Sequence, residues 1–194
     1  MGDISNRLVL AIGFTVVLSG CVPIMEHYYM PSALNGSAVR RDCHGKAGPV
    51  SDIEFVRGGV TILITSRYKP ESATTLALDV QFQLSQSSHV IVQWSNMKLH
   101  QSDGKSISFS TANNTFAYNL PMTLAGMTNA HASNISKMEG NKFSIYEVTL
   151  NVTEQLSERF IFELPPMTIN GIRYPATNIT YMKKQGLWVM PLNC

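Results

Sequence analysis

Charged residues are scarce in this sequence of 194 residues, and they form no basic stripe. Asp, Glu, Lys and Arg make up only 14% of the chain, the formal net charge is +2, and the only adjacent cationic pairs are Arg40-Arg41 and Lys183-Lys184. A domain that binds nucleic acid normally carries clustered Lys and Arg along one face. The composition therefore predicts no nucleic-acid partner.

The motifs of well-known enzymes and metal sites are missing as well. The chain contains no Gly-x-Ser-x-Gly, no His-Glu-x-x-His and no glycine-rich phosphate loop. Three Ser-x-x-Lys matches begin at Ser66, Ser95 and Ser102, but they fall in predicted strands or turns, whereas the motif requires a helical turn. The five histidines are scattered along the chain. We therefore expect no catalytic residues, no cofactor and no metal site.

The longest apolar run lies near the N-terminus and is too short to span a membrane. Residues 8–18 (LVLAIGFTVVL) carry no charge, but a spanning helix needs about 20 apolar residues. A run of this length, followed by small residues, is typical of a signal peptide. It leads into Leu18-Ser19-Gly20-Cys21, which resembles the lipobox of bacterial lipoproteins at all four positions.

This resemblance covers residues 1–21 only, and it implies that residues 1–20 are a signal peptide cleaved before Cys21. The cysteine would then carry acyl chains on its sulfur and its amine, and two or more chains are enough for stable anchoring in a membrane. Val22 follows, in place of the aspartate that retains such lipoproteins in the inner membrane. The resemblance therefore implies an outer-membrane anchor. We expect the domain to lie in the periplasm, and the sequence leaves the cell surface open as the alternative. The alternative is an ordinary secretory signal that leaves Cys21 as a thiol.

Two cysteines, Cys43 and Cys194, remain once Cys21 is acylated. Because the cell envelope is oxidising, an even pair of cysteines predicts a disulfide. One alternative is a metal site that combines Cys43 with His44, although a single Cys-His pair supplies few ligands. The other alternative is two free thiols.

Residues 22–38 contain Pro, Gly and Ser but no hydrophobic periodicity. We therefore expect the lipidated cysteine and a tether over residues 21–38, followed by a single β domain over residues 39–194. At about 3.3 Å per residue, the tether would reach roughly 50 Å and would hold the domain clear of the bilayer.

From about residue 50, apolar residues alternate with polar ones, which is the pattern of half-buried antiparallel strands. The clearest segments are TTLALDVQFQL, HVIVQW, SIYEVTLNV and RFIFEL. Their predicted inward residues are Leu76, Leu78, Val80, Phe82, Leu84, Val90, Val92, Trp94, Tyr146, Val148, Leu150, Val152, Phe160, Phe162 and Leu164. The only helix that the pattern allows is a short one within residues 128–138.

Turn sequences predict the register of three hairpins. Two-residue loops at Gly58-Gly59 and Asn170-Gly171 place apolar residues opposite one another. These facing pairs are Phe55–Ile62, Ile53–Ile64, Ile169–Ile172 and Met167–Tyr174. At Asp103-Gly104 a two-residue loop would set Leu99 against Ser108, so we predict a three-residue loop with Gly104 left-handed in a bulge. That loop sets Leu99 opposite Ile107.

Together these patterns predict an all-β fold. About 8–10 short strands at regular spacing indicate a sandwich or a barrel. Because each long strand has one polar face, we expect an antiparallel immunoglobulin-like β-sandwich, with a lipocalin-type β-barrel as the alternative.

The longest stretch without strand periodicity runs from Pro121 to Asn141, and connections longer than about 12–15 residues are usually functional or disordered. Methionine-rich apolar sets adapt well to binding partners. We therefore predict an interaction loop over residues 122–138, although the same residues would also serve to cover one end of the sandwich. Its candidate contact residues are Met122, Leu124, Met127, His131 and Met138.

The expected function is that of a non-catalytic, outer-membrane-anchored lipoprotein whose β domain binds or stabilises another envelope component. The expected partners are the membrane, through lipidated Cys21, and an envelope protein. A carrier that holds a lipid or another apolar ligand in a β cavity is the alternative, and an unrecognised enzyme is a third possibility. The sequence does not indicate an oligomeric state.

We expect peptide mapping of the unreduced protein to show Cys43 joined to Cys194. The bond would close a long loop and stabilise the fold by up to about 5 kcal/mol in the chain-entropy model, so Cys194→Ser should lower the melting temperature without loss of strand content. Two thiols that are freely alkylated in unreduced, denatured protein would contradict the pairing.

Overall fold

The computed structural model describes residues 22–40, 49–68, 76–85, 88–92, 97–108, 114–117, 130–136 and 143–190. All regular structure in these ranges is β-strand, and no helix that could cross a membrane occurs in them. The strands are β1 (Val22–Ser32), β2 (Ser37–Val39), β3 (Asp52–Arg57), β4 (Val60–Tyr68), β5 (Leu76–Ser85), β6 (His89–Val92), β7 (Lys98–Gln101), β8 (Ser106–Ser108), β9 (Asn114–Ala117), β10 (Ala130–Ser136), β11 (Phe143–Val152), β12 (Arg159–Leu164), β13 (Met167–Ile169), β14 (Ile172–Tyr174) and β15 (Thr177–Met190).

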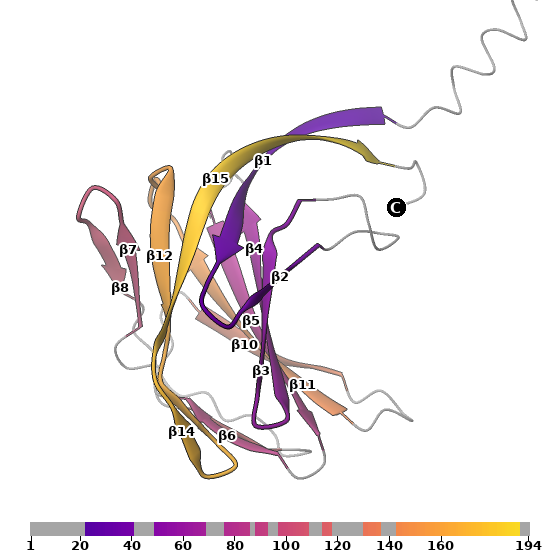
Figure 1. Ribbon diagram of the computed structural model, residues 1–194, viewed down its shortest axis with the longest axis vertical. Helices are drawn as coiled ribbons and strands as arrows, with labels where there is room; N and C mark the ends of the chain where they lie inside the picture. The colour runs from indigo at the N-terminus through magenta and orange to yellow at the C-terminus, as the bar shows by residue number, and fades with distance from the viewer. Residues whose placement is uncertain are drawn as a thin grey trace, which may run out of the picture.

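The strands form three antiparallel sheets (Figure 1). A six-stranded sheet has the order β10-β11-β5-β4-β3-β2, a five-stranded sheet the order β1-β15-β12-β7-β8, and a four-stranded sheet the order β14-β13-β6-β9. Each sheet has two edge strands in the described part of the chain. The fold is therefore an open β-sandwich and not the lipocalin-type barrel that was the alternative.

The five-stranded and four-stranded sheets continue one another as a single layer. In the five-stranded sheet β15 lies beside β12, and in the four-stranded sheet β14 lies beside β13. Strand β13 follows β12 directly in the chain, and β15 follows β14, so each pair of strands leads into the other sheet. Pro165-Pro166 and Pro175 lie at these junctions. Because proline has no N–H to donate, the ladders are interrupted there and the layer divides into two sheets.

The predicted alternation and hairpin registers are confirmed wherever the structure describes the residues. Every predicted inward residue except Trp94, which lies outside the described ranges, is buried between the layers. The facing pairs at Gly58-Gly59 and Asn170-Gly171 are those expected, and Leu99 faces Ile107. Gly104 has φ +87°, and the loop closes with a 2.8 Å bond from Gln101 N to Lys105 O.

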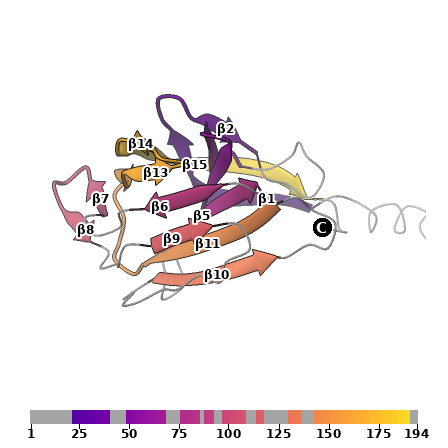
Figure 2. The ribbon, with the colours of Figure 1, turned by 90° about the horizontal axis from the view of Figure 1, so that it is seen from below.

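The β3–β4 hairpin contacts the four-stranded sheet, whose strands β14, β13, β6 and β9 are seen in this order in Figure 2. Asn170, in the β13–β14 turn, donates its side-chain amide to the carbonyl of Gly58 at 2.9 Å. A Cβ atom on Gly58 would lie 3.0 Å from a methyl group of Ile169, and this glycine has a left-handed φ of +54°. Both conditions favour glycine at this contact between the layers.

Two sequence expectations differ from the structure. The tether expected within residues 21–38 contains β1, paired with β15 from Val22 to Ser32, and β2. Residues 130–136, expected to be a loop or a short helix, form strand β10 on the edge of the six-stranded sheet. Neither segment alternates apolar and polar residues, so periodicity gave no signal for them. With short strands such as β13 and β14 also present, the total exceeds the expected 8–10.

An aromatic cluster fastens β1 to the five-stranded sheet. The Tyr29 ring meets Phe160 of β12 edge-on at 4.9 Å, and Phe160 stacks on Tyr181 of β15 at 4.8 Å. The Tyr29 hydroxyl donates to the carbonyl of Ser157 at 2.9 Å. Burial is the main cause that raises the pKa of both Tyr29 and Tyr181 above that of an ordinary phenol, so both stay protonated.

We expect Phe160→Ala to lower the free energy of unfolding by about 3–5 kcal/mol, because it leaves a cavity between two buried rings. Met182→Ala, at an exposed position of β15, is the matched control and should change it by no more than about 0.5 kcal/mol. Urea unfolding followed by circular dichroism measures both. Equal effects of the two substitutions would contradict the role of the cluster.

Candidate functional site

A cleft of about 540 Å³ opens where three separate segments of the chain, residues 34–35, 56–57 and 174–178, meet. Its walls come from the β1–β2 turn, the end of β3, the β14–β15 junction and the start of β15. The lining residues are Leu34, Asn35, Val56, Arg57, Tyr174, Pro175, Ala176, Thr177 and Asn178. We call this the Arg57 cleft, because Arg57 is the only Lys, Arg, Asp or Glu among them.

The Arg57 guanidinium is held by three side chains. Its central carbon lies 5.1 Å from the centre of the Phe55 ring and 5.6 Å from that of Tyr174, and Nη2 donates to Thr177 Oγ1 at 2.7 Å. Nη1 is buried and has no hydrogen-bond partner among the described residues. Burial lowers the pKa of Arg57 from its usual value, but an arginine remains charged at neutral pH.

The chemistry of the Arg57 cleft is that of binding. It combines a fixed positive charge with the amides of Asn35 and Asn178 and with the exposed apolar side chains of Leu34 and Val56. Such a lining suits a partner segment that presents an acidic group beside apolar side chains. None of its lining residues offers a nucleophile paired with a base.

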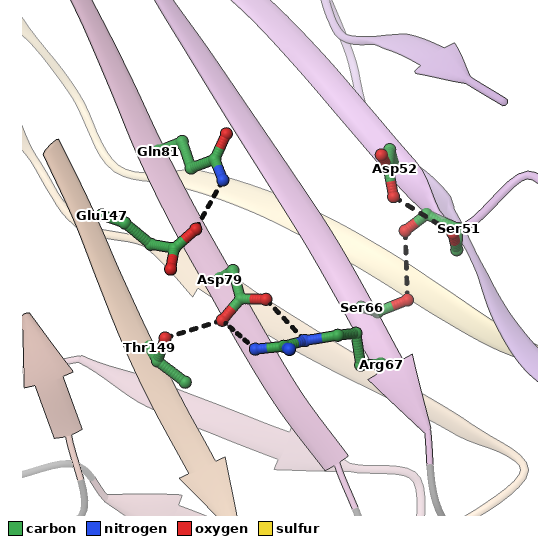
Figure 3. A network of polar contacts seen from close by, with 8 residues as sticks. All are labelled: Ser51, Asp52, Ser66, Arg67, Asp79, Gln81, Glu147 and Thr149. Atoms are coloured by element: carbon green, nitrogen blue, oxygen red, sulfur yellow. Dashed lines mark hydrogen bonds and ion pairs between the residues drawn. The ribbon is translucent and has the colours of Figure 1, made fainter. Parts of the chain in front are cut away.

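The outward face of the six-stranded sheet carries a polar network (Figure 3). Asp79 on β5 is nearly buried and binds Arg67 through both carboxylate oxygens, with N–O distances of 2.7 and 2.8 Å. Thr149 on β11 donates to the same carboxylate at 2.7 Å. Glu147 accepts a hydrogen bond from Gln81. Each of the two carboxylates thus has a hydrogen-bond partner on a neighbouring strand.

Asp79 belongs to a polar row that crosses five of the six strands of the sheet. The strand registers place Asp52, Thr65, Asp79, Thr149 and His131 side by side on β3, β4, β5, β11 and β10. Directly paired residues of antiparallel strands share a face, so Asp52, Thr65, Asp79 and Thr149 lie on one face. Asp79 links β5 to β4 through Arg67 and to β11 through Thr149. Within the described residues no group of three His, Cys, Asp or Glu side chains is arranged to hold a metal ion.

A second cleft, of about 300 Å³, lies over β7 and β12 and is lined by His100, Gln101, Ser102, Arg159, Phe160 and Ile161. His100 Nδ1 is 2.9 Å from Ser106 Oγ. Gln101 Oε1 accepts two bonds from Ser157, at 2.8 and 2.9 Å. A serine–histidine pair acts as a nucleophile only when a third group orients the histidine. No carboxylate does so among the contacts that the structure describes for His100.

Most residues that the sequence singled out lie outside the described ranges. These are Cys21, Cys43, Met122, Leu124, Met127, Met138 and Cys194. Of the predicted interaction loop, only His131 falls in a described segment, where it belongs to β10 and pairs with Thr149. The Arg57 cleft escaped sequence reasoning because its walls come from segments more than 100 residues apart, and only the position of Arg57 next to a Gly-Gly turn hinted at it.

Comparisons of the chain with protein-family models, with curated proteins and with solved structures give no match.

We expect Arg67→Ala to destabilise the fold by roughly 1–3 kcal/mol, because it leaves the nearly buried Asp79 carboxylate without its cation. Lys105→Ala is the matched control, since it breaks the exposed Lys105–Asp103 pair and should cost about 0–1 kcal/mol. Chemical denaturation of both variants measures the difference. Equal costs would show that the Asp79 pair contributes no more than a surface contact.

Proposed function

We propose that this protein is an outer-membrane lipoprotein whose β-sandwich is a non-catalytic module that binds another component of the cell envelope. The observation that carries the proposal is the Leu18-Ser19-Gly20-Cys21 motif at the end of an apolar run of signal-peptide length. Cleavage before Cys21 would leave the sandwich attached to the membrane by acyl chains. The domain would then work in the periplasm.

The Arg57 cleft is the binding surface that the proposal assigns. The charge of its Arg57 guanidinium supports an acidic ligand group, because arginine forms strong, charge-assisted hydrogen bonds with carboxylates. The exposed side chains of Leu34 and Val56 at its rim would contact apolar residues beside that group. The partner is therefore expected to present an acidic, partly apolar segment.

The alternative of a lipid carrier receives no specific support. The side chains between the layers, such as Leu78, Val80 and Phe82, are fully buried in one continuous cluster. A carrier would instead hold an apolar cavity at this level. An enzyme is less favoured still, since the serine, histidine and carboxylate side chains described above are engaged in structural contacts.

The test uses the full-length protein in cells. Metabolic labelling with palmitate should mark the protein, and Cys21→Ala should abolish the label. In the lipidated background, Val56→Asp places a carboxylate beside Arg57 and should remove most of the partner recovered by chemical cross-linking and mass spectrometry. Ile172→Asp is the matched control, because the exposed fractions are 69% for Val56 and 58% for Ile172 and Ile172 does not line the cleft.

Both variants should melt at nearly the same temperature as the parent protein, because both positions are exposed. An unchanged palmitate label in Cys21→Ala would refute the anchor. Equal partner recovery with Val56→Asp and with Ile172→Asp would refute the assignment of the Arg57 cleft.

A further inference from the structure

Strands β1 and β15 extend beyond the sandwich as a two-stranded ribbon (Figure 1). The pairing of β15 with β12 ends at Met182, whereas its pairing with β1 continues to Met190 opposite Val22. From Lys184 onward, β15 therefore has β1 as its only strand neighbour in the described part of the chain.

Both faces of this ribbon are exposed at Met25 and Glu26, where the structure describes the side chains. Met25 and Glu26 are consecutive, so their side chains point to opposite faces, and both are exposed. Met25 and its cross-strand partner Leu187 are 65% and 64% exposed. A two-stranded ribbon without a covering layer is marginally stable in water. A contact that covers the ribbon would therefore stabilise it.

The composition of the ribbon changes abruptly along its length. The four cross-strand pairs nearest to Cys21 contain only apolar residues: Val22–Met190, Pro23–Val189, Ile24–Trp188 and Met25–Leu187. The next pairs bring charge and hydrogen-bonding groups: Glu26–Gly186, His27–Gln185 and Tyr28–Lys184. An apolar end that contains a tryptophan and is followed by tyrosine and lysine is typical of a segment at a membrane surface.

We propose that the apolar end of the ribbon, residues 22–25 and 187–190, is inserted into the headgroup region of the leaflet that holds the acyl chains of Cys21. This inference rests on the proposed lipidation. Strand β1 begins at the residue after Cys21, and consecutive Cα atoms are only about 3.8 Å apart. A lipidated Cys21 therefore brings the end of the ribbon to the bilayer surface, with no free chain between them.

The insertion is shallow. Four residues of strand measure roughly 13 Å, and the backbone groups on the open edges of a two-stranded ribbon find no partners in hydrocarbon. At the level of the headgroups, water and lipid oxygens can pair with those groups. Lys184, which is exposed and lies beyond the apolar pairs, would meet the anionic headgroups.

The free edge of β1 is poorly suited to another strand. Pro23 and Pro31 both lie in β1 and lack the N–H group that strand pairing uses. Prolines on an edge strand are a common means of preventing the addition of a further strand. The sequence of the edge therefore favours lipid over a second copy of the chain or a β-strand partner.

The test uses the full-length lipidated protein in vesicles of phosphatidylethanolamine and phosphatidylglycerol. The chain has two tryptophans, Trp94 and Trp188, so Trp94→Phe leaves Trp188 as the only indole. Its emission should be shifted to the blue and quenched more strongly by lipids brominated near the glycerol than by lipids brominated at the chain end. The reciprocal variant Trp188→Phe should show no such quenching.

Two double variants test the surface itself in the Trp94→Phe background. Met25→Ser with Leu187→Ser should remove most of the quenching, whereas Ile91→Ser with Ile172→Ser, at exposed positions outside both the ribbon and the Arg57 cleft, should leave it unchanged. Mass spectrometry of Cys21 is read first. A cysteine without acyl chains would refute the proposed function and this inference with it.

With acyl chains present, two results would overturn the insertion alone. A Trp188 emission typical of water would show an exposed ribbon. A blue-shifted emission that brominated lipids do not quench would show that protein covers the ribbon, either a second copy of the chain or a partner.

Discussion

The contact of Phe160 with Tyr29, edge-on, and with Tyr181, stacked, is the interaction on which the position of β1 depends. Strand β1 lies at the edge of its sheet, and Tyr29 is its one aromatic residue in the core. The Ser66 hydroxyl of the facing sheet also donates to the carbonyl of Tyr29 at 3.2 Å. The middle of β1 is thus fixed to both layers, while its first residues leave the sandwich with β15.

The sequence predicted those parts of the fold in which one face of a strand is buried and the other is exposed to solvent. For such strands, alternation reveals the inward residues, and turn chemistry reveals the register. The left-handed Gly104 is an example, because only a three-residue loop sets Leu99 against Ile107. Alternation is absent from the ribbon, whose end nearest to Cys21 is apolar on both strands, and from β10, whose residues AHASNIS are mostly small or polar. The position of these strands is set by the strands with which they pair, and not by an alternation of apolar and polar residues in their own sequence.

The candidate site was less accessible to sequence reasoning than the fold. The Arg57 cleft forms only where the β1–β2 turn, the end of β3 and the β14–β15 junction come together. A local sequence pattern does not predict contacts between segments so far apart in the chain. One strand, β15, nevertheless connects the Arg57 cleft with the ribbon. Thr177, which bonds Arg57, is the first residue of β15, and Met190, at the end of the ribbon, is the last. On the two proposals, this strand runs from the ligand to the lipid, a path of roughly 40 Å.

The pairing of β1 with β15 also has a mechanical consequence. The register is unbroken over the full length of β1, from Val22 to Ser32. A pull applied at Val22 along the axis of β1 acts in shear, so the hydrogen bonds between the two strands bear the load together and do not open one after another. The same number of bonds in a peeling geometry would yield at a much lower force. A chain that is attached through the residue before Val22 would thus resist extraction through its most extended ladder.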